Sequence, residues 1–376
     1  MDFSLSETQE LLRRTLREFL QREYPSRVVR AAEASERGYL PEIYRRLGEL
    51  GVLGLTVPEA EGGAGGGWVD LAVFYEEAGR ALLASPHLSS VVLGGGLLAR
   101  WADSAQRQAW LPALASGERV LAVAWPLDAG EPGPCGLVAQ PAAGGYRLRG
   151  EVPHVAHYVG ADAVLLVAER ADAAGRLGLF LADPTAPGLT VTPQPLQSGE
   201  PLVRLRCDDV WLPAEAAVGE PQPAAVLFGP TLDGAKTAVA ALALGGAAAA
   251  VDMAVAYAKE RHQFGRPIGS FQAIQHRLAR LAMLVEEARL LVYAAAWQLD
   301  QGMEARRAAA MAKLQAGTAF REAATGCILV HGGYGFMLET DPQLYYRRAK
   351  VLEFAFGPPA AQQALIAATH TPFIPA

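Results

Sequence analysis

Two hydrophobic periods alternate along this chain, and their order constrains the fold more than any other feature of the sequence. Over residues 1 to about 118, apolar residues recur every three or four positions, as on one face of a helix. From about 119 to 222 the pattern changes to short runs rich in Val and Leu, bounded by Gly, Pro and Asp. From about 223 onward the helical spacing returns. The sequence therefore predicts an α+β multidomain protein with a helical N-terminal domain (1–118), a β-barrel or β-sandwich middle domain (119–222) and a C-terminal four-helix bundle (223–376).

The start of the first helix and the extent of the long C-terminal helices can be read from local patterns. Ser6 and Gln9 stand three positions apart before an apolar run, which is the spacing of a capping box. In the C-terminal region, helical periodicity predicts four long helices, over 231–260, 271–301, 303–332 and 341–354.

The composition excludes several classes of protein. Hydrophobic residues make up 51% of the 376 residues and charged residues 19%, so the chain can bury a core and is not disordered. Its net charge of −6 leaves no basic surplus to neutralise phosphates, which argues against a nucleic-acid-binding protein. Cys135, Cys207 and Cys327 lie far apart, so they form no disulfide framework and no metal-ligand spacing with histidines. A reducing cytoplasm and no metal site are the expectation.

One apolar stretch, over 237–258, is long enough to raise the question of a membrane span. The stretch is mostly alanine, which is a strong helix former and a weak membrane residue, and it contains Gly245, Gly246 and Asp252. We expect a buried helix of a soluble protein rather than a membrane span. The opening MDFSLSETQE is polar and acidic, unlike a secretory signal peptide.

Two segments of the C-terminal region carry the most specific signal. Residues 261–276 read RHQFGRPIGSFQAIQH, and residues 331–336 read HGGYGF. Both closely resemble the acyl-CoA dehydrogenase family. The opening MDFSLSETQELLRRTLREFL, the stretch LGELGVLGLTVPEAEGGAG and the segment QRQAWLPALASGE are similar to that family too. The resemblance covers essentially the whole chain.

The resemblance implies an FAD-dependent flavoprotein of fatty acid metabolism, an oxidoreductase that dehydrogenates an acyl-CoA thioester between its α- and β-carbons. It implies the same order of three domains and a tetramer arranged as a dimer of dimers. The flavin of such proteins lies between the β domain and the bundle, and the RxxFG segment of a neighbouring subunit grips its adenosine-diphosphate end. By the resemblance, the cofactor-binding residues are Arg261, Phe264, Gln272, Gln275, Gly332 and Gly333.

The residue types at these positions suit that role. The planar guanidinium fork of Arg261 matches a pyrophosphate, and Phe264 offers an aromatic surface. Gly265 allows a ligand to approach the backbone, and the glutamine amides can bond ribose and adenine edges. The plainer interpretation is a loop between two helices with a solvated arginine, and a helix C-cap at Gly332 and Gly333. For the glycines both interpretations can hold together.

The usual catalytic carboxylate of the family is absent at both positions where the resemblance would place it. The family removes the weakly acidic α-proton of a thioester, which requires a base. The common glutamate position, aligned on Gly357, is Phe356 here, and the position used by other members is Ala235. Neither phenylalanine nor alanine can accept a proton.

A few nearby residues could replace the missing base. Glu353 lies one helical turn before Phe356, and a shifted backbone could bring it toward a pocket, although a solvated or capping role is also open. Asp233, His154 and His157 are weaker candidates, and local hydrogen bonding explains the histidines equally well.

The segments that pack on the flavin ring in the family are also changed here. Thr-Glu-Pro is replaced by Ala124-Trp125-Pro126, Trp-Ile-Thr by His154-Val155-Ala156, and the glutamine before the Gly-Gly pair by Leu329. By the resemblance, the adenine side of the flavin site looks kept and the ring side looks rebuilt.

Four functions remain open at this point. The chain could be one of two different subunits of a hetero-oligomeric acyl-CoA dehydrogenase, with a second chain of the family bringing the base. It could be a homo-oligomer with a displaced base such as Glu353. It could be a flavin monooxygenase on the same fold, which needs no α-proton base, or a non-catalytic relative that binds a partner or acyl-CoA.

Overall fold

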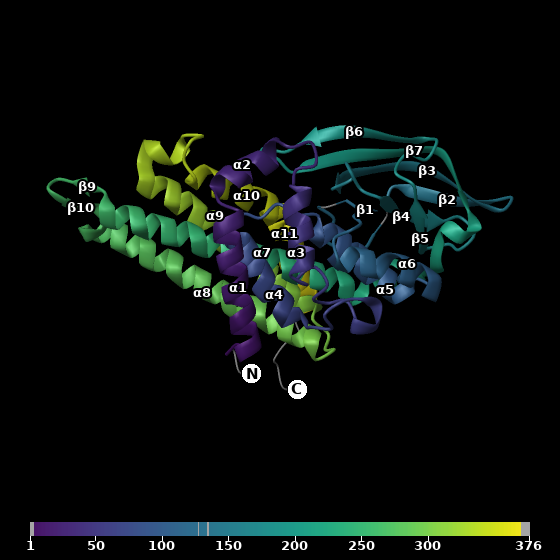
Figure 1. Cartoon of the computed structure of the whole chain (residues 1–376), viewed down its shortest axis with the longest axis horizontal. Helices are drawn as coiled ribbons and strands as arrows, with labels where there is room; N and C mark the ends of the chain where they lie inside the picture. Colours follow the sequence, from purple (N-terminus) through teal and green to yellow (C-terminus); the bar gives the residue numbers. More distant parts are fainter. Residues whose placement is uncertain (1–3, 127, 134, 370–376) are drawn as a thin grey trace. The chain divides into compact units, whose positions relative to one another are not determined.

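The computed structural model describes residues 4–126, 128–133 and 135–369, and it confirms the predicted α+β order (Figure 1). Helices come first in the chain, a sheet lies in its centre and long helices follow. The described residues form two compact units that each combine separate stretches of sequence. The first unit takes the described parts of Met1–Val29, Trp68–Leu83 and Lys236–Ala376, and the second takes those of Arg30–Gly67 and Ala84–Ala235.

The first unit is almost entirely helical. Its elements are α1 (Glu7–Glu23), the start of α2 (Ser26–Ala34), α4 (Trp68–Arg80), most of α7 (Ala224–Glu260), β9 (His262–Gln263), β10 (Arg266–Pro267), η4 (Ile268–Ser270), α8 (Gln272–Asp300), α9 (Arg306–His331), η5 (Gly332–Phe336), α10 (Pro342–Phe354) and α11 (Pro359–Ala368). The capping box is confirmed, because the Gln9 N–H donates to Ser6 Oγ at 3.2 Å while the Ser6 N–H donates to Gln9 Oε1 at 3.0 Å. The four long helices predicted from periodicity are confirmed as α7, α8, α9 and α10.

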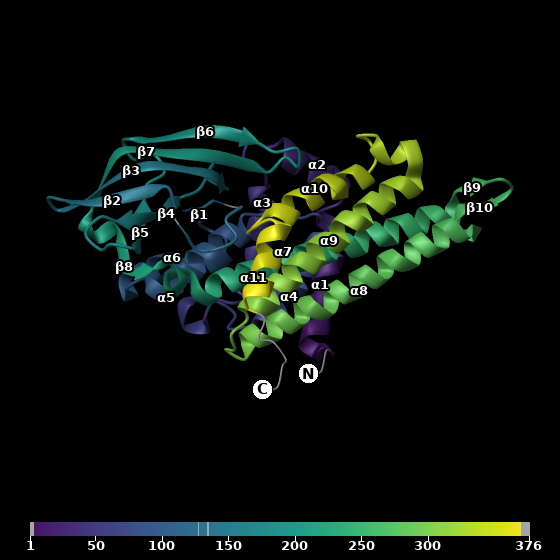
Figure 2. The same ribbon diagram turned by 180° about the vertical axis from the view of Figure 1, so that it is seen from behind.

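Helix α9 occupies the middle of this unit. It packs against α8, α10 and α11, and the opposite views of Figures 1 and 2 both show α8 running beside it. Much of α9 is buried and rich in alanine, so neighbouring helices can lie close to its axis. The large side chain that fills this region is Phe320, which is fully buried.

Helix α7 contains the apolar stretch of the sequence. By length and composition alone it could cross a membrane, but 72% of its most apolar window is buried inside the protein. Its regular part begins after Gly229, where the backbone breaks the helix (φ 40°, ψ −131°) just before Pro230. Burial of this window agrees with the expected core helix.

Helices α4 and α7 pack so closely that their backbones are in contact. A Cβ added at Gly79 would lie 2.0 Å from the Leu242 carbonyl oxygen, and one added at Gly245 would lie 1.8 Å from the Glu76 carbonyl oxygen. Only glycine can occupy these positions without moving a helix, because real Cβ atoms do not come so close to other atoms. The two glycines therefore fix how closely these helices pack.

The second unit contains the sheet. Its elements are the rest of α2, α3 (Pro41–Glu49), η1 (Glu59–Glu61), η2 (Leu88–Gly95), α5 (Gly96–Trp101), α6 (Ser104–Ala115), β1 (Leu121–Ala124), β2 (Leu137–Ala142), β3 (Gly145–Ala156), β4 (Ala163–Arg170), β5 (Arg176–Ala182), β6 (Leu189–Pro195), β7 (Pro201–Pro213), η3 (Ala214–Ala216), β8 (Ala217–Pro223) and the first residues of α7.

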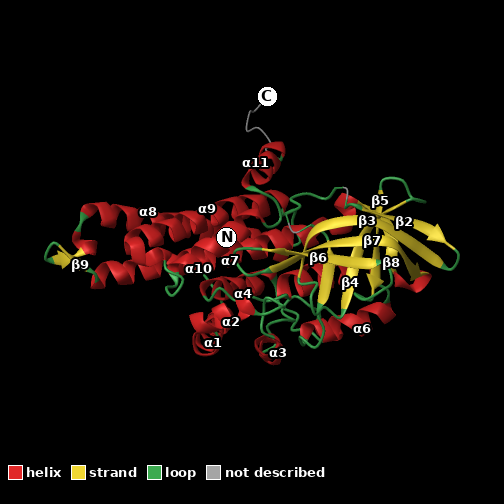
Figure 3. Cartoon of the chain, turned by 90° about the horizontal axis from the view of Figure 1, so that it is seen from above, coloured by secondary structure: helices red, strands yellow, loops and turns green. Residues whose placement is uncertain are grey.

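The eight strands form one sheet in the order β6-β7-β3-β2-β4-β5-β8, with β1 pairing to β4 (Figure 3). The β1–β4 and β2–β4 pairs are parallel and the other pairs are antiparallel. One face carries the core of the unit, which includes Leu148, Leu166, Phe180 and Leu205. Strand β3 has a register shift between Val152 and Val155, which places a bulge beside His154.

We expect Gly245→Ala to destabilise the first unit by at least about 2 kcal/mol, because the new methyl group must push α4 and α7 apart. Gly317→Ala is the matched control, since Gly317 also lies inside a long helix and its added Cβ would meet nothing closer than 3.7 Å. That change should be neutral or stabilise the helix by up to about 1 kcal/mol. Urea unfolding measures both, and equal effects of the two substitutions would contradict the close approach of α4 and α7.

A buried histidine in the second unit makes stability depend on pH. His87 is fully buried, its Nε2 lies 2.9 Å from the Leu53 carbonyl oxygen, and burial lowers the pKa of His87 from 6.5 to about 4. The folded protein therefore holds the imidazole neutral at a pH where the unfolded chain protonates it. Stability is complete above pH 6.5 and falls as the pH drops toward 4.

We expect the free energy of unfolding to drop between pH 7 and 4.5 by up to about 3 kcal/mol more in the natural protein than in His87→Gln, whose amide does not titrate. The control is His276→Gln, which makes the same exchange at an exposed histidine of α8. Urea unfolding at the two pH values measures the difference. If the free energy of unfolding fell equally in the natural protein and in His87→Gln, His87 would not be the cause of the pH dependence.

Candidate functional site

The RxxFG segment forms a short hairpin between helices α7 and α8. Strands β9 and β10 pair antiparallel, with Gln263 opposite Arg266 and His262 opposite Pro267. Phe264 (φ 53°) and Gly265 (φ 78°) make the turn, and two positive φ values in succession are typical of a type I′ turn. The arm, as we call residues Arg261–Ser270, thus owes its tight turn to the Phe-Gly pair.

The tip of the arm is open to solvent. The Phe264 side chain is 93% exposed, and a Cβ added at Gly265 would meet no atom within 4 Å. Behind the tip, the Phe271 ring packs edge-on to Phe264 with centroids 6.2 Å apart, and the Arg266 guanidinium lies 4.1 Å above the Phe271 ring. The arm presents an apolar ring and an accessible backbone to whatever binds there.

Arg261 stands at the base of the arm, directly after α7. Its N–H donates to the Tyr257 carbonyl at 2.8 Å and its carbonyl accepts from the Ile268 N–H at 2.8 Å, so its backbone is fixed. The side chain is exposed, and within the described parts of the chain its guanidinium has no hydrogen bond or ion pair. An immobilised backbone with an uncommitted guanidinium is a suitable arrangement for binding an anion.

The two glutamines lie on the first turns of α8, beside the arm. Gln272 is the first residue of the helix and is exposed. Gln275 is also exposed, but its Nε2 donates to the Gly269 carbonyl at 3.0 Å, so this amide braces the arm. For Gln275 the structure thus adds a local role to the predicted contact with a cofactor.

Gly332 and Gly333 end α9 and lie open. Gly332 adopts φ 64° and ψ −142°, a conformation that favours glycine, and neither residue would place a Cβ within 4 Å of another atom. Beneath them, His331 Nδ1 lies 2.8 Å from the Cys327 carbonyl oxygen, which agrees with a structural role for this histidine.

A tyrosine that the sequence did not single out joins the two motifs. The Tyr257 ring, one turn before Arg261, stacks on His331 with centroids 4.1 Å apart and lies parallel to Tyr334 at 6.4 Å. The end of α7 and the end of α9 are therefore adjacent, which brings Gly332 close to the base of the arm. The only signal of Tyr257 in the sequence is its spacing, because a residue four positions before Arg261 lies on the same face of a helix.

The weak candidate for the base, Glu353, is committed to cations. It is 8% exposed, and its carboxylate pairs with Arg321 Nε at 3.1 Å and with Lys350 Nζ at 3.1 Å. Its carbonyl accepts from the fully buried Lys313 Nζ at 2.9 Å, and burial lowers the pKa of Lys313 to about 8. The carboxylate of Glu353 is therefore engaged in two ion pairs within the first unit.

The two positions at which the sequence resemblance would place the base are apolar and buried. Phe356, in the first unit, is 1% exposed with φ 53°, and Ala235, in the second, is 0% exposed. Gln362 donates from Nε2 to the carbonyls of Phe356 at 2.9 Å and Gly357 at 3.3 Å. The backbone at Phe356 is thus held in place around a side chain that cannot accept a proton.

In the second unit, the changed segments form packed local contacts. The Trp125 ring packs against Phe228 with centroids 4.2 Å apart. His154 Nδ1 lies 3.0 Å from Asp128 Oδ1, and His157 Nδ1 lies 3.2 Å from Ser89 Oγ. Both histidines have positive φ and local partners, which agrees with the plainer interpretation of these residues. Asp233 is half-buried and also has a partner.

Comparison with known proteins gives matches over nearly the whole chain. Residues 6–118 match the family model of the acyl-CoA dehydrogenase N-terminal domain, and residues 227–370 match that of the C-terminal domain. The "Probable acyl-CoA dehydrogenase YngJ" of Bacillus subtilis (strain 168) is 33% identical, over 98% of this chain and 99% of its own.

Solved structures are also similar to this chain over nearly its whole length. The ChsE4-ChsE5 complex from Mycobacterium tuberculosis contains a chain of 30% identity and TM-score 0.89, covering 99% of this chain and 100% of that one. A variant of the Tcur3481-Tcur3483 steroid ACAD has 32% identity and TM-score 0.86, covering 97% and 98%. With its helix and sheet order, its RxxFG arm and its full-length similarity to these proteins, the chain belongs to the acyl-CoA dehydrogenase family.

Proposed function

We propose that this chain is a subunit of an FAD-dependent acyl-CoA dehydrogenase that introduces a double bond between the α- and β-carbons of an acyl-CoA thioester. The observation that carries this proposal is the arm, because its exposed tip and uncommitted Arg261 guanidinium are unexplained by the packing of the chain itself. Membership of the family and similarity over 98% of the chain to a dehydrogenase support the same conclusion.

The residues at the arm fit the adenosine-diphosphate end of FAD. Arg261 would bind the pyrophosphate through its fork of N–H groups, and the open backbone at Gly265 and Gly332 would leave room for a close contact. Gln272 would offer its exposed amide to a polar edge. Phe264, Gln275 and Gly333 complete the set that we assign to the cofactor. When bound, FAD supplies the acceptor for the hydride that leaves the β-carbon.

The second part of the proposal is that a different chain of the same family provides the base. In this chain Phe356 and Ala235 are buried and apolar, and the Glu353 carboxylate is paired with Arg321 and Lys350. Removing the α-proton of a thioester still requires a positioned base. The similarity to a chain of the ChsE4-ChsE5 complex supports a hetero-oligomer of two related chains, in which this chain contributes its arm.

We further propose a tetramer of such chains in a reducing, cytoplasmic compartment. The buried free thiols of Cys135, Cys207 and Cys327 are compatible with that compartment. The two family models, at residues 6–118 and 227–370, support sequence domains at 1–118, 119–222 and 223–376.

Arg261→Gln should reduce the FAD content of the purified protein at least about tenfold, because the substitution removes the charge-assisted hydrogen bonds to the pyrophosphate. The control is Arg45→Gln, because Arg45 is an exposed arginine of α3 and does not belong to the arm. The visible spectrum and the ratio of flavin to protein measure the result. Unchanged flavin in Arg261→Gln with an intact fold would contradict the role of the arm.

We expect the yellow protein, titrated anaerobically with a panel of acyl-CoA thioesters, to bleach only when the second family chain is co-expressed with it. In that complex Glu353→Gln should leave the bleaching rate within about twofold, because we assign the base to the other chain. Bleaching by this chain alone that is lost in Glu353→Gln would instead establish a displaced base. A flavin that no thioester bleaches, even in the complex, would favour the non-catalytic or monooxygenase alternatives.

A further inference from the structure

The first half of α8, next to the arm, has one covered and one open side. Between residues 272 and 280 no side chain is fully buried, and even Ile274 and Leu278, on the inner side, are only half-buried. Helix α9 covers the side of Leu281, because a Cβ added at Gly326 would lie 2.5 Å from Leu281 Cδ1. Figures 1 and 2 both show this part of α8 at the edge of the first unit. The opposite side of the helix is therefore accessible to another molecule.

Apolar residues follow the open side of α8 at helical spacing. Ala279, Met283 and Leu290 lie on it, four and seven residues apart, and all three are exposed. Met283 is 63% exposed and Leu290 is 51% exposed. Single exposed apolar residues are common on protein surfaces, but a row of them along one face is typical of a helix that packs against another helix.

Two residues of opposite charge lie along one edge of this row. Arg280 and Glu287 are seven residues apart, so two turns of helix place them on the same edge, one before and one after Met283. Arg280 is exposed, and in the described parts of the chain its guanidinium has no hydrogen bond or ion pair. Glu287 accepts from the Gln315 amide at 2.8 Å, and this neutral donor leaves the charge of the carboxylate in place.

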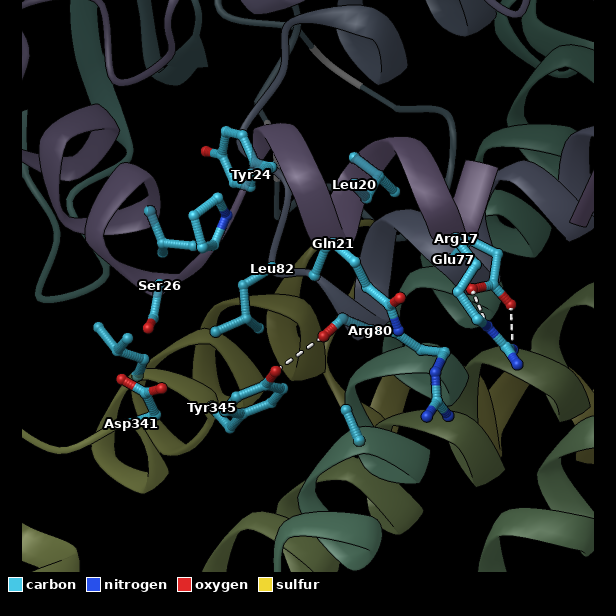
Figure 4. A pocket seen from close by; sticks show the side chains of 15 residues that line it. Arg17, Leu20, Gln21, Tyr24, Ser26, Glu77, Arg80, Leu82, Asp341 and Tyr345 are labelled. Atoms are coloured by element: carbon cyan, nitrogen blue, oxygen red, sulfur yellow. Dashed lines mark hydrogen bonds and ion pairs between the residues drawn. The ribbon is translucent and has the colours of Figure 1, made fainter. Parts of the chain in front are cut away.

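The region between α1 and α4 shows the contrast, because its arginines are paired within the chain. Arg17 donates to both oxygens of Glu77, at 2.9 and 2.6 Å, beside the pocket drawn in Figure 4. Arg80 lines the same pocket and pairs with Asp252. On the open side of α8, by contrast, the charge of Arg280 is available to a carboxylate of another molecule.

We propose that a second copy of this chain packs against the open side of α8, with the two α8 helices antiparallel about a two-fold axis midway between positions 283 and 284. This axis places Arg280 of each copy opposite Glu287 of the other, and it brings Met283 of both copies together beside the axis. A parallel pair would instead set Arg280 against Arg280 and Glu287 against Glu287. The order of charges along the helix therefore selects the antiparallel arrangement.

The length of α8 suits such a contact. The helix has 29 residues and is about 44 Å long, so two antiparallel copies can touch over several turns. The small side chain of Ala279 allows the two helices to approach closely. This inference rests on the proposed tetramer and deepens it, because it names the face of this chain at which two of its copies meet. It does not depend on the proposed dehydrogenase activity.

A charge exchange tests the pairing. Arg280→Glu and Glu287→Arg should each weaken the association of the copies at least about tenfold, because each change occurs twice at a two-fold interface and sets like charges opposite each other. The double substitution exchanges the two charges, so it should restore the association to within about threefold of the natural protein. Residues seven positions apart do not pair within one helix, so this restoration reports a contact between copies. Sedimentation velocity of the FAD-loaded protein over a range of concentrations measures the association.

Two further variants sharpen the test. Met283→Glu should also weaken the association at least about tenfold, because two carboxylates would meet beside the axis. Arg45→Glu makes the same charge reversal at an exposed arginine of α3 and should leave the association unchanged. The thermal unfolding midpoint of each variant checks that its fold is intact.

Three results would overturn the proposed interface. They are a natural protein whose copies do not associate, an association that neither charge reversal weakens, and a double substitution that does not restore it. The third result would indicate that a chain of different sequence covers α8. Flavin content and bleaching by acyl-CoA thioesters are recorded on the same samples, so a failure of the proposed dehydrogenase function is seen separately from a failure of this interface.

Discussion

The buried carboxylate of Glu76 holds together the helices on which the rest of the first unit depends. Its side chain accepts from Tyr293 of α8 and lies 3.9 Å from Arg13 of α1, while Arg289 of α8 pairs with its other oxygen. Removing one partner of a buried ion pair typically costs about 3–5 kcal/mol, because an uncompensated charge remains. Since the same residue offers its carbonyl to the close approach of Gly245, the ionic cluster and the helix crossing constrain each other.

The arm is fixed at its base and exposed at its tip. Helices α7 and α8 run the length of the unit, and their ends carry the hairpin (Figure 2). The Tyr257–His331 stack and the two backbone hydrogen bonds of Arg261 fix the last turn of α7. Beyond them, the tip makes few contacts, so the arm is prepared to contact a ligand or another chain without first ordering its base.

The sequence predicted most of the fold because local patterns determine it. The period of apolar residues sets helix or strand, and Ser6 and Gln9 set the first cap. Contacts between distant residues could not be predicted in this way. Arg321 reaches Glu353 across two packed helices, and no spacing in the sequence announces that pair. The cluster of Arg13, Glu76 and Arg289 could not be predicted for the same reason, because its members come from three separate stretches of the chain.

The backbone around Phe356 is tightly constrained, although its side chain is apolar and buried. A non-glycine residue with φ 53° is mildly strained, and two hydrogen bonds from Gln362 hold its neighbouring carbonyls. A carboxylate at a position that is 1% exposed would need either a proton or a cation to compensate for its burial. Restoring a base here therefore involves more than one substitution. Phe356 itself is buried, and the acidic residue nearest to it in the sequence, Glu353, is already paired with Arg321 and Lys350.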